Sequence, residues 1–289
     1  MSRLSGGSAR KRDNKPALLG SLLKNLQSED GLSIVRDLCD NRSHAMWALL
    51  LTWTAQASPT TVAPGRYGIH LKTATHAHIP VLGEMPGASV VWLLAEILPS
   101  MEGEPELVQR TCSVRMEGSG ERASVMLSPG FLAALPEKHH NLVFSESGQV
   151  FIDMGEDHIG YDPTLYPDAL PRDEAAPGLI DFDGDGNPGA TVIITVPILG
   201  TVELYIAQHA QSSLVGQIHS DGTLTGTVES LLLEQQTLDA TNPLMRMSPR
   251  MSLDTAHSHW RMQPLPADTT CDTIIERMCL TGGSGCAEG

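Results

Sequence analysis

The stretch "SLVGQIHSDGTLTGTV", residues 213–228, decides how the chain folds. It contains two runs rich in β-forming residues, and Asp221-Gly222 lies between them. An Asp-Gly pair in this position is the strongest short-range signal for a β-hairpin, because both turn residues must accept a positive φ. The stretch therefore predicts two antiparallel strands joined by a tight turn.

The same β pattern extends outward from this hairpin over most of the chain after Ser58. In "RYGIHLKTAT", the side chains of Tyr67, Ile69 and Leu71 alternate onto one face, which is the period of a strand. About ten such segments at short spacing predict a mainly β fold, an antiparallel sandwich or barrel. The echo of "HIPVLGE" (78–84) in "TVPILGT" (195–201) is also compatible with two packed β subdomains.

One or two short helices are expected within this β body. In "SPGFLAAL", Ser128 is in position to cap a helix and Pro129 to begin it. The stretch "TTCDTIIERMC", 269–279, begins at a threonine cap and precedes Gly282-Gly283. We divide the chain into a disordered or spurious extension (1–35), a candidate signal peptide (36–57), a β region (58–160), a Pro/Asp-rich linker with an acidic loop (161–189), a second β region (190–265), and a cysteine-containing helix and tail (266–289).

The segment 36–57 has the order of a secretory signal. Arginines precede the apolar run "AMWALLLTW", and Ala55-Gln56-Ala57 supplies the small residues that a signal peptidase reads. The run is too short to span a bilayer, which takes about 20 residues. A signal that begins near residue 36 requires residues 1–35 to be an extension from a misplaced start; the other interpretation of the run is a buried amphipathic helix. We expect a secreted, periplasmic or cell-surface protein.

The charge of the chain argues against two classes of partner. The 289 residues carry 19 lysines and arginines against 34 acids, a net charge of −15. Nucleic acids and anionic membrane surfaces both attract clustered positive charge. We therefore expect no nucleic-acid partner and no anionic membrane surface as a partner, and an acidic body that suits cation binding. No integral membrane span is expected either, because the apolar run at 45–53 is too short for one.

Four cysteines would remain after removal of the signal: Cys112, Cys271, Cys279 and Cys286. An even number in an oxidising compartment favours disulfides, and four cysteines allow three pairings that sequence does not distinguish. The alternative is four free thiols in a cytosolic protein.

The stretch "DFDGDGNPG", residues 181–189, places three acids at alternating positions with glycines between and after them. Calcium takes six to eight oxygen ligands, and acids at positions 1, 3 and 5 of a tight loop can aim their carboxylates at one point. The predicted metal ligands are Asp181, Asp183 and Asp185 through side chains and Asn187 through its carbonyl. Asp162, Asp173 and Glu174 are candidates for the remaining oxygens, and the other interpretation is a solvated turn without an ion.

This loop resembles the calcium loop of EF-hand proteins over its first six positions. It departs afterwards, since position 12 is Val192 rather than glutamate and "ATVIITV" predicts a strand. It is more similar to the shortened D-x-D-G-D-G loops of FG-GAP and thrombospondin type 3 proteins, and the whole chain resembles uncharacterised bacterial secreted proteins with one such loop. The resemblance implies calcium and no particular activity.

Two histidine pairs are further candidates for a metal site. His76 and His78, like His257 and His259, form H-x-H, which on a strand places both rings on one face and can bind zinc or copper. Exposed strands also carry such pairs with no function. The hydrolase motifs G-x-S-x-G and H-E-x-x-H and the Walker loop do not occur, so no catalytic or cofactor-binding residue is assigned and an enzyme is less expected than a binding protein.

We expect a secreted, calcium-stabilised β protein with a binding or structural role, whose partner is a protein, a glycan or a small apolar ligand. The alternatives are a secreted hydrolase with structural calcium and a β-barrel carrier of a small apolar ligand.

Overall fold

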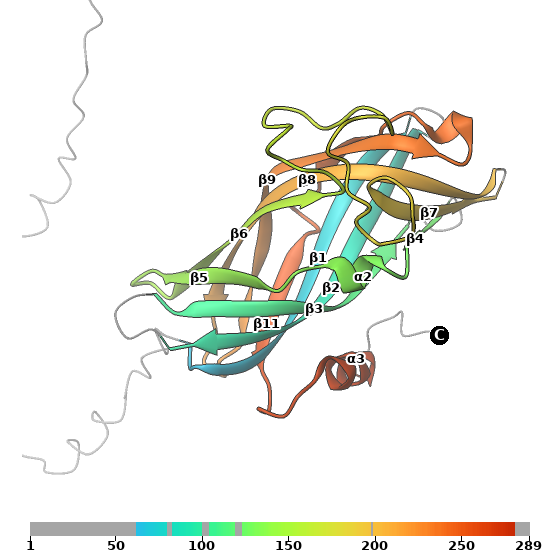
Figure 1. The fold of residues 1–289 in the computed structure, drawn as a ribbon. Helices are drawn as coiled ribbons and strands as arrows, with labels where there is room; N and C mark the ends of the chain where they lie inside the picture. The colour runs from blue at the N-terminus through green and yellow to red at the C-terminus, as the bar shows by residue number, and fades with distance from the viewer. Residues whose placement is uncertain (1–61, 80–82, 100–103, 119–122, 198, 281–289) are drawn as a thin grey trace, which may run out of the picture. The chain divides into compact units, whose positions relative to one another are not determined.

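The computed structural model describes residues 62–79, 83–99, 104–118, 123–197 and 199–280 (Figure 1). The expected extension and signal peptide therefore lie outside the described residues. The strands are β1 (Gly65–Ile79), β2 (Gly83–Leu98), β3 (Glu106–Glu117), β4 (Ser124–Leu127), β5 (Lys138–Phe144), β6 (Gln149–Ile159), β7 (Ala190–Val196), β8 (Gly200–Ile218), β9 (Leu224–Ala240), β10 (Arg250–Leu253) and β11 (His259–Pro264). The helices are α2 (Phe131–Ala134), the 3-10 turn η2 (Pro243–Met245) and α3 (Cys271–Leu280).

The strands form one 11-stranded antiparallel sheet that closes on itself. The ring runs β1–β2–β3–β5–β6–β8–β9–β11 and returns to β1 through the β1–β11 pairing, while β7 and β4 extend from β8 and β10 pairs with β1 (Figure 1). The prediction of a mainly β, antiparallel, barrel-like fold with short helices is confirmed.

The hairpin predicted at Asp221-Gly222 forms between β8 and β9. Gly222 has φ 79°, and the His219 N–H donates to the Thr223 carbonyl across the turn at 2.8 Å. Further along the pair, Gly216 and Gly226 lie opposite each other. A Cβ on Gly226 would meet the Val215 carbonyl oxygen at 1.9 Å and Trp260 Nε1 at 2.7 Å, so only glycine lets the buried Trp260 ring pack there.

Strand β8 is the longest, with 19 residues, and it holds the two ends of the sheet together. One edge pairs first with β7, through residues 200–206, and then with β6, through residues 208–217. The other edge pairs with β9 from Leu204 to Ile218.

Buried side chains gather into two main clusters within this sheet. The first includes Ile69, Leu107 and Ile152, all fully buried, with Trp260 packed among them. The second includes Ile159, Val192 and Ile206 and reaches Phe131 in α2. The repeated "PVLG" and "PILG" stretches fall at two equivalent hairpin connections, β1–β2 and β7–β8, where Gly83 and Gly200 have φ 77° and 75°. The echo therefore marks the same kind of connection used twice.

Two segments cover the outside of the sheet. Helix α3 packs on β2 and β3 through Ile274, Leu94 and a disulfide between Cys112 and Cys271, whose Cα atoms are 5.1 Å apart. This confirms one disulfide of the expected set; Cys286 and the side chain of Cys279 lie outside the described residues. The segment 160–180 lies over β8 and β9, where Tyr161 packs with Ala207 and Leu238.

Candidate metal centre

The acidic loop, residues 181–189, is a closed turn at the start of β7. The Phe182 N–H donates to the Gly189 carbonyl at 2.8 Å, and the Gly189 N–H donates to the Ile180 carbonyl at 2.9 Å. Gly184 and Gly186, with φ 71° and 90°, turn the chain sharply between the acids. A backbone in this conformation disfavours side chains with a Cβ, which explains the glycines between the aspartates.

The three predicted carboxylates converge. One oxygen from each of Asp181, Asp183 and Asp185 lies within 4.8 Å of the others. Backbone N–H groups hold two of these side chains: Asp181 accepts from Asp185 N at 3.1 Å and Gly186 N at 2.9 Å, and Asp185 accepts from Asn187 N at 2.9 Å. The structure thus brings together the three acids that the sequence predicted, with Asn187 adjoining them.

Asp183 is the innermost of the three. Its Oδ2 accepts from the Thr191 N–H at 3.0 Å and from the Ser128 hydroxyl. Its Oδ1 is buried and has no hydrogen-bond partner among the described residues. A buried carboxylate oxygen without a partner costs on the order of 1–3 kcal/mol or more, so this atom requires a cation or a water to be satisfied.

The loop is anchored to a segment far away in sequence. A Cβ on Gly130 would lie 1.9 Å from the Asp183 carbonyl oxygen, and the Phe131 and Phe182 rings are 5.3 Å apart. Ser128 was expected to cap α2, but Gly130 occupies the cap position and no side chain caps the helix. The Ser128 hydroxyl instead donates to the Asp183 carboxylate, a charge-assisted hydrogen bond.

Hydrogen bonds favour the ionised form of the Asp185 carboxyl. Partial burial acts to raise the pKa of the Asp185 carboxyl, but hydrogen bonds from Thr191 Oγ1, at 2.6 Å, and from Asn187 outweigh it, and the net pKa lies below its ordinary value. The three further acids proposed as ligands are not part of the converging group. Asp162 and Asp173 close turns of their own, by accepting from Thr164 N and Ala175 N.

The two H-x-H pairs do not form a common histidine site with three converging ligands in the part of the chain described. His76 and His257 each contact Asp254, at 3.3 Å and 2.7 Å, while His78 contacts Glu84 at 2.8 Å. The fourth ring, His259, lies beside His70. Within each pair, the two rings therefore have different partners.

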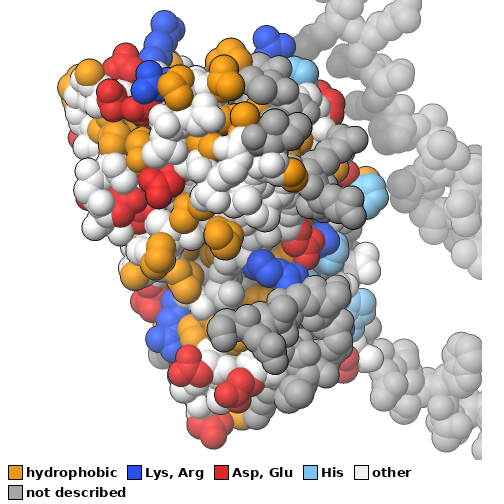
Figure 2. All heavy atoms as spheres, turned by 90° about the vertical axis from the view of Figure 1, so that its right-hand side faces the viewer, with side chains coloured by type: hydrophobic (Ala, Val, Ile, Leu, Met, Phe, Trp, Pro, Cys, Tyr) orange, Lys and Arg blue, Asp and Glu red, His pale blue; other side chains and the backbone are white. Residues whose placement is uncertain are grey.

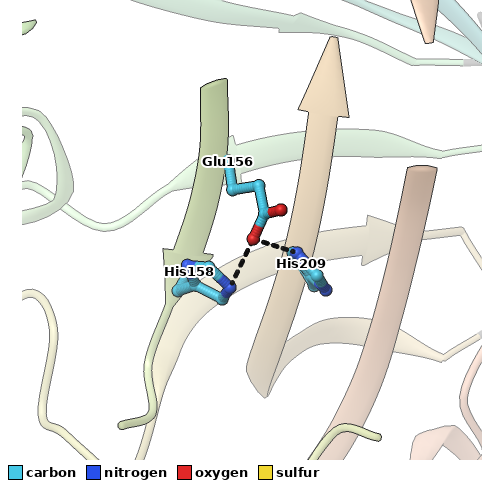
Figure 3. Close-up of side chains that lie close together, drawn as sticks. All are labelled: Glu156, His158 and His209. Atoms are coloured by element: carbon cyan, nitrogen blue, oxygen red, sulfur yellow. Dashed lines mark hydrogen bonds and ion pairs between the residues drawn. The ribbon is translucent and has the colours of Figure 1, made fainter. Parts of the chain in front are cut away.

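A second group of converging metal-ligating side chains was not predicted from the sequence. Glu156 and His158 on β6 and His209 on β8 bring metal-ligating atoms within 4.8 Å of one another (Figure 3). The sequence signal is a single E-x-H on a strand, and His209 is 51 positions beyond His158. Only the pairing of β6 with β8 places these side chains together.

A groove of about 540 Å³ opens between β5 and β6. It is lined by Lys138, His140 and Met154, and by the exposed cross-strand pair Val143 and Phe151. Figure 2 shows another aspect of the surface, a face on which acidic, basic and apolar side chains are interspersed. No helix among the described residues is long and apolar enough to cross a membrane.

Comparison with known proteins identifies no family. No family model matches the chain, and no curated protein matches it. A solved structure, that of DynF from the dynemicin biosynthesis pathway of Micromonospora chersina, matches with 12% identity over 72% of this chain and 90% of that one, with a TM-score of 0.27. Similarity at that level says nothing about the function of this chain.

Proposed function

We propose that the acidic loop binds a calcium ion through Asp181, Asp183, Asp185 and Asn187, and that the protein is a secreted, calcium-stabilised β protein with a binding or structural role. The buried and unpartnered Asp183 Oδ1, beside two converging carboxylates, is the observation that carries this proposal.

The ligand chemistry favours calcium over other common ions. The group offers oxygen atoms only, which suit a hard cation. Calcium accepts irregular sets of six to eight oxygens, whereas magnesium demands a tight octahedron and retains water.

The ion would act as a clamp between distant parts of the chain. The loop contacts the segment before α2 through Ser128 and Gly130, and the start of β7 through Thr191. Neutralising three carboxylates at this junction removes their mutual repulsion and holds the three segments together. A secreted location is supported by the disulfide, since disulfides persist in oxidising compartments.

Thermal unfolding in calcium and in chelator tests the proposal. At a free calcium concentration 100 times the dissociation constant, binding to the folded state alone adds about 2.7 kcal/mol of stability. For a body of this size that gain corresponds to a rise in melting temperature of roughly 5–10 °C. Magnesium at the same concentration should raise it less.

The decisive comparison uses two substitutions of matched chemistry. Asp183→Asn retains the shape of the innermost ligand but removes its charge, and should abolish the calcium response. Asp221→Asn alters an aspartate that closes a different turn, by accepting from Thr223 N at 3.0 Å, and should leave the response intact. Equal melting of the wild-type protein in calcium and in chelator, once the metal has been verified as removed, would refute the site.

A further inference from the structure

Glu156, His158 and His209, which we call the outer-face cluster, owe their position to a β-bulge in β6. Before the bulge, Ile152 and Met154 point into the first core cluster, and after it Ile159 points into the second. The register with β8 shifts between Asp153 and Glu156, and Gly155 has φ 68°. The extra residue moves Glu156 from the inner to the outer face, where it joins His158 two positions later.

Pairing with β8 then completes the cluster. His158 and His209 are direct partners across the ladder, so their side chains emerge side by side on the same face (Figure 3). Their side chains are 24% and 22% exposed, against 50% for Glu156. The imidazoles are thus held by surrounding structure while the group remains accessible to an ion from solvent.

The spacing of the ligand atoms suits a tetrahedral ion. Glu156 Oε2 lies 3.4 Å from His158 Nε2 and 3.3 Å from His209 Nε2. Around zinc, with bonds of about 2.0–2.1 Å to nitrogen and oxygen, the edge of the tetrahedron is about 3.3–3.4 Å. The two rings stack at 4.4 Å with 25° between their planes, and the Nε2 atoms of both lie near the same carboxylate oxygen of Glu156.

A second carboxylate lies on the same face. Glu234 of β9 is the direct partner of His209 across the β8–β9 ladder. Burial raises the pKa of the Tyr161 hydroxyl, and the negative charges of Glu234 and Glu156 raise it further, which places both acids near this ring. Tyr161 in turn packs edge-on against His158, with centroids 5.7 Å apart. The cluster therefore sits in a locally negative environment that favours a cation.

We propose that Glu156, His158 and His209 bind a divalent transition metal of the zinc class, with Glu234 or water as the fourth ligand. Two imidazoles and a carboxylate are a ligand set for such ions and a poor one for calcium, which prefers oxygen alone. The site is separate from the acidic loop, so the absence of metal binding at one site would not contradict the proposal for the other.

Calorimetric zinc titration of the untagged, metal-stripped full chain, with calcium saturating, tests this proposal. One zinc ion should bind, and cobalt in its place should give the intense visible absorption of a tetrahedral complex. His209→Gln and, as a second variant, Glu156→Gln should each weaken zinc binding by at least about 10–100-fold, the loss that even indirect changes around a metal cause. Circular dichroism establishes that each variant is folded.

Two histidine substitutions serve as matched controls. His219→Gln changes a histidine near the β8–β9 turn, and His76→Gln changes one of the H-x-H pairs. Both should bind zinc as the wild type does. Absence of zinc binding in the wild type, unchanged binding in folded Glu156→Gln and His209→Gln, or loss of binding in His76→Gln instead would overturn the proposal and leave the cluster as an ion pair only.

Discussion

The acidic loop and the outer-face cluster both gather three metal-ligating side chains, but they are assembled in opposite ways. The loop draws its acids from five consecutive positions and holds them with its own backbone N–H groups. The cluster draws on two strands and exists because a bulge and a strand pairing coincide. The loop is also tied into the core through Asp183, whereas the cluster lies on the surface of the sheet. Changes near the loop should therefore affect folding, and changes in the cluster should affect binding alone.

The largest effect on folding is expected for Gly130→Ala. The new Cβ would lie 1.9 Å from the Asp183 carbonyl oxygen. Both atoms are fixed by the backbone, so no side-chain rotation can relieve the clash. We expect a loss of about 3 kcal/mol in the free energy of unfolding, as in other overpacked sites, measured by denaturant unfolding in chelator. Gly184→Ala has open space but φ 71°, and should cost only about 1–2 kcal/mol. Equal costs would mean that the loop is not anchored at Gly130.

Acidification should weaken zinc binding at the outer-face cluster more than calcium binding at the acidic loop. Histidine binds a metal only in its neutral form, so protons compete with zinc for both imidazoles of the cluster, and zinc affinity should fall as the pH is lowered from about 7 to 5.5. The Asp185 carboxyl, whose pKa lies below its ordinary value, stays ionised over this range, so calcium affinity at the loop should change little. Titration calorimetry of each metal at both pH values measures the contrast. A parallel loss of both affinities would contradict it.

Thr191→Val should produce a moderate effect confined to the loop. The buried Thr191 hydroxyl donates to Asp185 Oδ2 at 2.6 Å, and valine keeps the volume while removing the donor. We expect a loss of about 1–2 kcal/mol without calcium.

The same substitution should change the response to acid. Because the folded-state pKa of Asp185 lies below the unfolded value, its contribution to stability is present above the unfolded pKa and is lost as pH falls through the folded one. Removing the Thr191 donor raises that folded pKa and should flatten the acid limb of the stability curve. Denaturant unfolding between about pH 2.5 and 6, the range over which carboxyl groups titrate, measures this limb. A limb as steep as that of the wild type would show that Thr191 does not lower the pKa of Asp185.

The smallest effect is expected for Glu156→Gln without metal. Ion pairs of half-exposed side chains contribute little, and most surface changes shift stability by less than about 0.5 kcal/mol. The unfolding midpoint should remain near that of the wild type, although zinc binding is lost. A loss of about 2 kcal/mol or more, the size seen for buried networks, would show that the cluster stabilises the fold as the acidic loop does.

The sequence by itself determined the local features of this protein. The Asp-Gly hairpin, the β alternation of Tyr67, Ile69 and Leu71, and the three converging aspartates depend on neighbours within a few residues. Turn chemistry and strand period act over that range, so a pattern of residue types was enough to predict them.

Tertiary structure alone decided which distant residues meet. Ser128 carries the signature of a helix cap, yet its hydroxyl bonds to Asp183, which arrives 55 positions later. His158 meets His209 only because β8 pairs with β6, and Glu156 faces them only because Gly155 adds a residue to the strand. Periodicity cannot predict a bulge that inverts it, nor which strand becomes a neighbour, since ring closure is set by packing of the whole sheet.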